Sequence, residues 1–175
     1  MRITISGPIG SGKTTVCTLL SERTGMPYVV SGHIFRQMAK EHGLSLAEFG
    51  RLAERDPRYD IELDQRMVRL AEEKEDIILE GRLVAQMLTR HHIPALRVYL
   101  DASLEVRVDR VVEREGKDRE QACEELMERE ASEATRYLRY YGIDIRDRGV
   151  YDLIIDTGEL RPEQIVDKIV AAAGL

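Results

Sequence analysis

The fold is decided by one short stretch, Gly7-Pro8-Ile9-Gly10-Ser11-Gly12-Lys13-Thr14-Thr15. It satisfies the pattern G-x-x-x-x-G-K-[ST] and lies between a β-prone run at 3–6 and a helical pattern that extends to about residue 22. This context predicts a phosphate-binding loop, because glycines let the backbone N–H groups and the helix N-terminus point at phosphate oxygens. We expect the whole stretch to bind a nucleoside triphosphate, with Lys13 reaching the β- and γ-phosphates and the Thr14 hydroxyl ligating Mg²⁺.

The rest of the chain alternates strand-like and helix-like segments. We expect further strands at 28–30, 77–79, 96–100 and 153–155. They are nearly continuous apolar runs, which is typical of parallel strands buried on both faces. A long helical region at 34–74 divides into three pieces, with a capping-box pattern at 45–48 and a new start at Pro57.

A second helical region, at 103–141, is broken once at 116–118, and a last helix begins near Pro162. The sequence therefore predicts an α/β fold of three layers, α/β/α. Its five-stranded parallel sheet would carry helices on both sides and helical insertions. The length of 175 residues, without a linker or repeat, indicates a single domain.

Composition narrows the class of protein. The net charge of −6 argues against a nucleic-acid partner, because proteins that bind nucleic acids usually carry a net positive charge. No run approaches the roughly 20 apolar residues of a membrane span, and the N-terminus does not resemble a signal peptide. The two cysteines, Cys17 and Cys123, lie far apart with no C-x-x-C spacing, so we expect neither a disulfide framework nor a metal cluster. These features favour a cytoplasmic monomer.

Among proteins with this loop, a small-molecule kinase fits best. A switch GTPase needs an N-K-x-D segment to read guanine, and the chain contains no asparagine. The strands that end at Glu80 and Asp101 offer no clear base for activating water. Phosphoryl transfer needs chiefly in-line alignment and neutralisation of charge, which arginines and Mg²⁺ supply.

The arginines are numerous and their positions are informative. Five of the 26 basic residues are lysines, which leaves 21 arginines. Arg36 and Arg82 follow expected strands, at the sheet edge where open α/β folds bind ligands. Two further sets each share a helix face: Arg110 with Arg114, and Arg129 with Arg136, the latter with Glu133 between them. Each set is either a solvated face with ion pairs or part of a lid that closes over a polyphosphate.

Acidic residues on the same predicted surface are less distinctive. Asp60 and Asp64 share a face of the helix that follows Pro57, where they would either contact a ribose or base or remain solvated. A pair so near the start of a helix favours the solvated alternative.

The chain resembles the nucleoside monophosphate kinases, and among them the short archaeal-type cytidylate kinases. Beyond the phosphate-binding loop, the resemblance rests on motifs spread over residues 1 to about 157: Ser31-Gly32 with Phe35-Arg36, 44–50, Leu79-Glu80-Gly81-Arg82, 114–117, Arg129-Glu130 with Glu133-Ala134 and Arg136-Tyr137, and 141–144. The Glu-Gly-Arg and Arg-Glu…Arg-Tyr segments are the more specific ones. Bacterial relatives carry Asp where this chain has Glu80.

The resemblance implies transfer of the γ-phosphate of ATP to CMP or dCMP, with Mg²⁺. It implies an acceptor-binding region at about 31–74 and a lid at about 110–136. Acceptor-binding residues carried over by position are Ser31, Arg36, Glu80, Arg82, Arg129 and Arg136. Catalytic residues would be Lys13, Arg110, Arg114, Arg129 and Arg136. The alternatives are a kinase for another small acceptor, such as AMP, UMP or a coenzyme precursor, and a non-catalytic ATP-binding regulator.

Overall fold

A five-stranded sheet organises the chain. The structure is a computed structural model and describes residues 1–175, apart from the side chain of Ala47. The strands are β1 (Arg2–Ser6), β2 (Tyr28–Val30), β3 (Ile77–Glu80), β4 (Leu96–Asp101) and β5 (Leu153–Asp156). Their order is β2-β3-β1-β4-β5 and every pairing is parallel, as the continuous apolar runs predicted.

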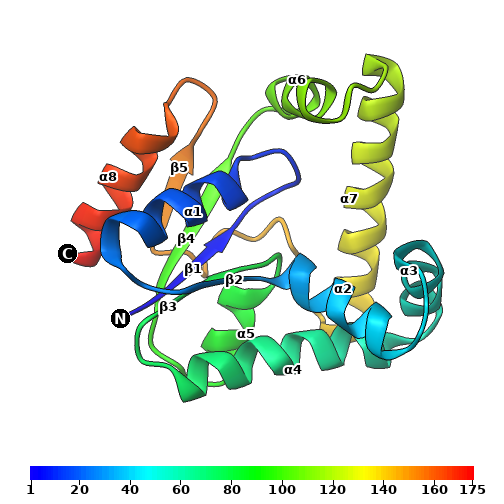
Figure 1. The fold of residues 1–175 in the computed structure, drawn as a ribbon, viewed down its shortest axis with the longest axis horizontal. Coiled ribbons are helices and arrows are strands. Elements are labelled where there is room, and N and C mark those ends of the chain that lie inside the picture. The colour runs from blue at the N-terminus through cyan, green and yellow to red at the C-terminus, as the bar shows by residue number, and fades with distance from the viewer.

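Helices cover both faces of this sheet and make the expected three layers (Figure 1). On one face, α1 (Lys13–Thr24) and α8 (Pro162–Ala173) pack through Cys17, Leu20 and Ile169, all fully buried. On the other face lie α4 (Pro57–Glu73) and α5 (Val84–Arg90). Burial of this apolar surface on both sides is the main source of stability for a parallel sheet.

The region after β2 forms three helices, as expected: α2 (Ser31–Glu41), α3 (Leu46–Arg55) and α4. The capping box is present, because Ser45 Oγ accepts from the Glu48 amide at 3.2 Å while the Glu48 carboxylate accepts from the Ser45 amide at 2.8 Å. Pro57 begins α4, where its missing N–H costs nothing. Phe49, fully buried, anchors α3 against α2 and α4.

The second helical region is a pair, α6 (Leu104–Glu115) and the 23-residue α7 (Arg119–Tyr141), with the break at Gly116. The two pack together through Val108, Val111, Ala122 and Leu126. Figure 1 shows α7 running beside the core from α6 down to the end where α2, α3 and α4 lie. The carboxyl ends of β1, β3 and β4 lie at the same edge of the sheet, because Ile5 pairs with Glu80 and Ser6 with Tyr99.

Helix α5 was not anticipated from the sequence. It has seven residues, of which Val84 to Leu88 are buried, so it shows no alternation of polar and apolar faces. Within the described residues, no helix is long and apolar enough to cross a membrane.

Candidate active site

The phosphate-binding loop connects β1 to α1 and packs against neighbouring backbone. A Cβ on Gly7 would lie 2.2 Å from the Leu100 carbonyl oxygen, so only glycine fits beside β4. Gly10 has φ +83°, and a Cβ there would lie 2.9 Å from the Arg107 carbonyl oxygen on α6. The glycines therefore let the loop fit between β4 and α6 in a conformation that other residues rarely adopt.

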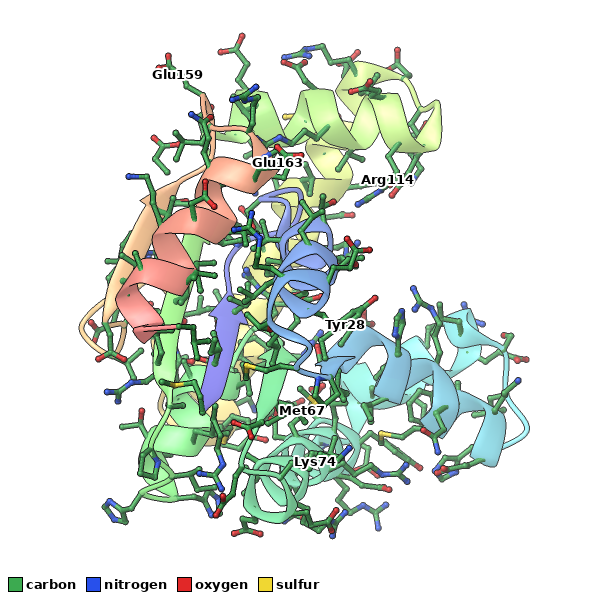
Figure 2. All side chains as sticks on the ribbon, turned by 60° about the vertical axis from the view of Figure 1, so that its left-hand side comes forward. Tyr28, Met67, Lys74, Arg114, Glu159 and Glu163 are labelled. Atoms are coloured by element: carbon green, nitrogen blue, oxygen red, sulfur yellow. The ribbon has the colours of Figure 1, made fainter. Side chains whose placement is uncertain are left out.

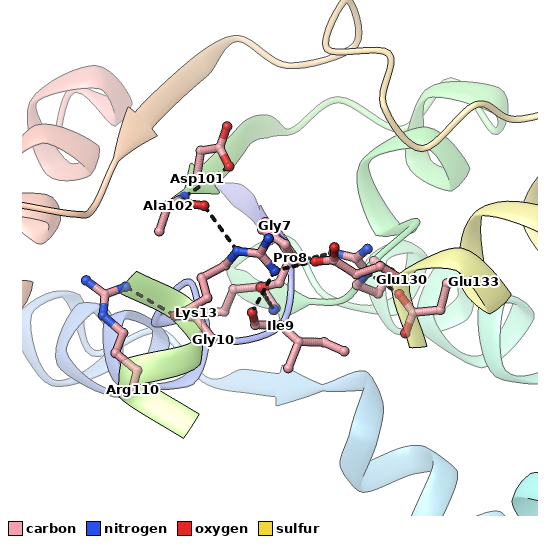
Figure 3. A network of polar contacts seen from close by, with 12 residues as sticks. Gly7, Pro8, Ile9, Gly10, Lys13, Asp101, Ala102, Arg110, Glu130 and Glu133 are labelled. Carbon is pink, nitrogen blue, oxygen red and sulfur yellow. Dashed lines mark hydrogen bonds and ion pairs between the residues drawn. The ribbon is translucent and has the colours of Figure 1, made fainter. Parts of the chain in front are cut away.

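Cationic side chains hold the outer edge of this loop (Figure 3). The carbonyl oxygens of Gly7, Pro8, Ile9 and Gly10 accept in turn from Arg82 (2.5 Å), Lys13 (3.0 Å), Arg107 (3.3 Å) and Arg110 (3.2 Å). The Ser11 amide donates to the Pro8 carbonyl oxygen at 3.3 Å. The N–H groups at the N-terminus of α1 are available for an anion. This arrangement suits a polyphosphate.

Lys13 is the ammonium group at the centre of the loop. Burial lowers its pKa to about 8, and the nearby Glu80 carboxylate opposes that shift. Its ammonium group donates to the Pro8 carbonyl oxygen. At neutral pH the side chain is therefore mostly protonated. Its positive charge lies at the loop, where it would attract a bound phosphate.

Thr14 and Glu80 meet beside Lys13. The Thr14 hydroxyl donates to Glu80 Oε2 at 3.1 Å, which brings the first turn of α1 to the end of β3. Hydroxyl and carboxylate oxygens are the hard donors that Mg²⁺ prefers. Among the described residues there is no cluster of three or more metal-binding side chains. The pair thus fits a Mg²⁺ ion whose other ligands come from phosphates and water, which is the usual arrangement for this ion.

A cavity of about 690 Å³ opens from this point between the core, α2, α4 and α7. It collects most of the residues that the sequence singled out: Lys13, Thr14, Ser31, Glu80, Arg82, Arg129 and Arg136. Ser31 begins α2 and lies against Gly81, where a Cβ would be 3.2 Å from its hydroxyl oxygen. Segments distant in sequence thus converge on one site at the carboxyl edge of the sheet, as expected for an open α/β fold.

Arg82 and Glu133 form a largely buried ion pair inside this cavity. Arg82 Nε lies 2.6 Å from Glu133 Oε2, and the side chains are 16% and 13% exposed. Charge-assisted pairs of this kind are short and oriented. Arg82 is thus held between the phosphate-binding loop and α7, where a second anion would meet it.

Asp60 and Asp64 correct the sequence-based interpretation, because they are not a solvated pair. Asp60 is 6% exposed, lines the cavity, and lies 3.3 Å from Arg136 Nε. Burial raises the pKa of Asp60, and Arg136 opposes the shift. Asp64 accepts from the Tyr141 hydroxyl at 2.5 Å, and burial raises its pKa to about 7. Helix α7 packs over this face of α4, and this tertiary contact is not visible in the helical spacing.

Arg36 lies apart from the other expected acceptor residues. It is exposed on α2 and lines a separate pocket with His33, Gln37 and Lys40. Its neighbour Phe35 lines the 690 Å³ cavity instead. In this structure α2 therefore presents Phe35, not Arg36, to the site.

A second pocket, of about 440 Å³, lies on the other side of the phosphate-binding loop. Gly10, Ser11, Gly12, Thr15, Arg110 and Arg114 line it together with Thr157, Leu160 and Pro162. Arg110 is fixed there by the Thr157 hydroxyl (3.0 Å) and carbonyl (2.7 Å). Figure 2 shows Arg114 below α6 on the side of α1, where it is 61% exposed and pairs with Glu115 at 2.7 Å. Each predicted helical arginine set therefore faces its own pocket.

Arg107 and Thr157 were not anticipated. Arg107 is 7% exposed and bonds Ala102 and Ile9 carbonyl oxygens and the Glu130 carboxylate. Arg107 precedes Arg110 by three residues on one helix, and residues at this spacing share a helix face. This spacing could have indicated that both arginines lie on the loop side of α6. Thr157, 1% exposed, donates toward the Ser11 and Asp101 carbonyl oxygens. Nothing in the local sequence marks it.

Similar solved structures show the same fold. A shikimate kinase from Bacteroides thetaiotaomicron superposes with a TM-score of 0.66 at 16% identity, covering 100% of this chain and 99% of that one. An uncharacterized protein from Eubacterium ventriosum gives a TM-score of 0.75 at 20% identity, covering 98% and 97%. At these identities the likeness establishes the fold alone.

Sequence relatives are much closer. A cytidylate kinase from Methanothermobacter thermautotrophicus is 49% identical, over 93% of this chain and 99% of the relative. One from Methanococcoides burtonii is 47% identical, over 97% and 94%. The model of the cytidylate kinase-like family matches residues 2–159, a span that contains the loop, the cavity and the helical pair. The chain therefore belongs to the cytidylate kinase-like family.

Proposed function

We propose that the protein transfers the γ-phosphate of ATP to CMP or dCMP, giving ADP and CDP or dCDP. The observation that carries this is the pair of pockets on either side of one phosphate-binding loop, of about 440 and 690 Å³. An arginine set faces each pocket, and family relatives named cytidylate kinase share both their length and about half their residues with this chain.

The donor would bind to the phosphate-binding loop. Its phosphates would lie on the N–H groups of Gly7 to Thr15, with Lys13 on the β- and γ-phosphates and Arg110 and Arg114 approaching from α6. We place the adenosine in the 440 Å³ pocket, beside Thr157 and Leu160. Thr14, with Glu80 beside it, would hold Mg²⁺, which neutralises phosphate charge when bound.

The acceptor would lie in the 690 Å³ cavity, with its phosphate toward Arg82 and Arg129 and its nucleoside toward Ser31 and Arg136. An oxygen of the acceptor phosphate attacks the γ-phosphorus, and the bond from that phosphorus to the bridging oxygen of ADP breaks. No covalent enzyme intermediate is needed, because the arginines and Lys13 act by alignment and charge stabilisation.

We further propose that residues 1–175 form a single kinase domain. Residues 31–74 would bind the acceptor and residues 110–136 would act as a lid, with Arg36 joining the acceptor site only when α2 moves. We also propose that the protein is a cytoplasmic monomer; its two free cysteines are consistent with a reducing compartment.

A panel of acceptors tests the activity. With ATP and Mg²⁺, CMP and dCMP are expected to be the best substrates among CMP, dCMP, UMP, AMP, GMP and shikimate, measured by coupled ADP release. If CMP and dCMP were the poorest acceptors, the assignment would be wrong. Tight ATP binding without turnover on any acceptor would support a non-catalytic regulator. Lys13→Ala should lower kcat by at least ~100-fold, because it removes the charge on the transferred group.

A further inference from the structure

Asp60 lines the 690 Å³ cavity with a carboxylate that accepts no hydrogen bond from the described residues. It lies on the first turns of α4 and is 6% exposed, and its Oδ2 atom is buried with no hydrogen-bond partner among the described residues. A buried oxygen of this kind is stabilised when a donor reaches it. A buried carboxylate that lines a binding cavity in this state is suited to accept a hydrogen bond from a ligand.

Arg136 presents a donor beside that acceptor. Its Nε atom lies 3.3 Å from Asp60 Oδ2, near enough for an ion pair, yet it too makes no hydrogen bond within the described part of the chain. The two groups attract each other without being aligned for a mutual hydrogen bond. Both side chains line the cavity, so a carboxylate and a guanidinium stand at neighbouring positions in its wall.

The surroundings hold both groups in place. One turn beyond Asp60, the Tyr141 hydroxyl donates to Asp64 at 2.5 Å and so ties α4 to α7. Leu63 of α4 and Phe35 of α2 line the same cavity and add apolar surface to a lining that is otherwise largely polar and charged. Apolar and aromatic side chains beside fixed polar groups are typical of sites that bind small molecules.

We propose that Asp60 and Arg136 select cytosine among the pyrimidines, with the Asp60 carboxylate accepting from the N4 amino group and Arg136 donating to N3. Cytosine carries its amino donor next to the N3 acceptor, which complements this pair. Uracil carries a carbonyl at position 4 and an N–H at position 3. Its acceptor would therefore face the Asp60 carboxylate, and its donor would face the Arg136 guanidinium. The inference rests on the proposed function and names the residues that give it specificity.

The pair alone would not reject adenine, because the N6 amino group and N1 of adenine present the same order of donor and acceptor. Exclusion of AMP would have to come from the size of the space between Phe35, Leu63 and α7. The selection assigned to Asp60 therefore concerns CMP against UMP, and that comparison is the relevant measurement.

The test is the ratio of kcat/KM for CMP to that for UMP in the wild type and in Asp60→Asn. The asparagine keeps the size of the side chain but brings a donor to the cavity. We expect the ratio to fall by about 10- to 100-fold, since one matched base contact gives about 1–3 kcal/mol of discrimination. Glu54→Gln is the matched control: it removes a carboxylate from an exposed residue lining the same cavity, and the ratio should stay unchanged.

A second measurement uses the wild type alone and does not depend on folding of the variant. The 5′-monophosphate of 2-pyrimidinone riboside lacks only the 4-amino group of CMP. Calorimetric titration should show it binding the wild type at least ~10-fold more weakly than CMP. In a folded Asp60→Asn, with KM for ATP as the check, this difference should shrink.

The outcomes separate the inference from the proposed function. If the wild type binds the 2-pyrimidinone nucleotide as well as CMP, the Asp60 assignment is overturned. An unchanged ratio in Asp60→Asn likewise overturns it, although CMP kinase activity would stand. If the wild type phosphorylates neither CMP nor dCMP, it is the proposed function that fails.

Discussion

The protonation of Asp64 should affect the pH dependence of the free energy of unfolding. Burial raises its pKa to about 7, the adjacent Asp60 adds to the shift, and the hydrogen bond from Tyr141 opposes it. In the unfolded chain an aspartate titrates near pH 3.9. Between these values the folded protein binds more protons than the unfolded chain, so the contribution of Asp64 to stability falls as pH rises from about 4 to 7.

Asp64→Asn should remove this dependence, because asparagine stays neutral and can still accept from Tyr141. The stability of the variant relative to wild type is expected to be about 2 kcal/mol greater at pH 8 than at pH 5, because only the wild type loses stability as Asp64 ionises. Urea unfolding of both proteins at the two pH values measures the difference. An equal effect at both values would show that Asp64 is ionised in the folded protein throughout this range.

At the residue scale, the sequence is informative where a motif fixes backbone geometry and uninformative where packing decides. The phosphate-binding loop, Glu80 and Arg82 follow from a strand–loop–helix pattern and from strand ends. The hydrogen bond between Thr14 and Glu80 was not deduced, because it depends on the register of β1 with β3. Asp60 was misread because its burial is caused by α7, a helix more than fifty residues later.

At the scale of elements, α7 connects the parts of the site. Arg82 after β3 pairs with Glu133, Arg107 of α6 pairs with Glu130, and Asp64 of α4 accepts from Tyr141. The first of these pairs engages the arginine expected to hold the acceptor phosphate. An incoming phosphate would therefore compete with the Glu133 carboxylate for Arg82.

Glu133→Gln should expose that competition. Without ligand, the variant is expected to be less stable than wild type, because Arg82 loses a largely buried partner. Inorganic phosphate should raise the melting temperature of the variant by more than that of the wild type. Differential scanning calorimetry with and without phosphate measures both effects.

Glu124→Gln, an exposed position on the same helix, is the control and should respond to phosphate as the wild type does. If phosphate stabilised Glu133→Gln no more than the wild type, Glu133 would not compete with anions at Arg82.

The helices also show which elements a sequence can reveal. Helices α3, α4 and α8 begin at a capping box or a proline, and α6 ends at Gly116, so their boundaries were predicted closely. Helix α5 has neither a side-chain cap nor a polar face, because it is short and buried between the sheet and α4. A buried helix of that length gives no periodic signal.

At the scale of the whole molecule, charge is unevenly distributed. The net charge is −6, yet cationic side chains surround the phosphate-binding loop. Arg129, exposed on α7, lines the acceptor cavity, whereas Arg110 and Arg114 line the donor pocket. We propose that α6 and α7 move toward the core, so that all three arginines approach one transferring phosphoryl group.

We therefore expect the protein to contract when both sites are filled. Small-angle X-ray scattering should give a smaller radius of gyration with CMP and a non-hydrolysable ATP analogue than without ligands. Shikimate in place of CMP is the control and should not add to the effect of the ATP analogue. A radius that stays constant with both nucleotides would argue against closure of the lid.

The loop whose carbonyl groups are held by Arg82, Lys13, Arg107 and Arg110 has a consequence for the thermodynamics of nucleotide binding. Ordering a flexible backbone costs about 1–2 kcal/mol per residue in entropy. Here the four side chains fix the loop backbone when the protein folds, so this cost is met before a nucleotide binds. Association of the triphosphate should consequently have a small conformational entropy cost at the backbone, whereas the loop amides that bind the phosphates should exchange slowly with solvent only after the nucleotide is bound.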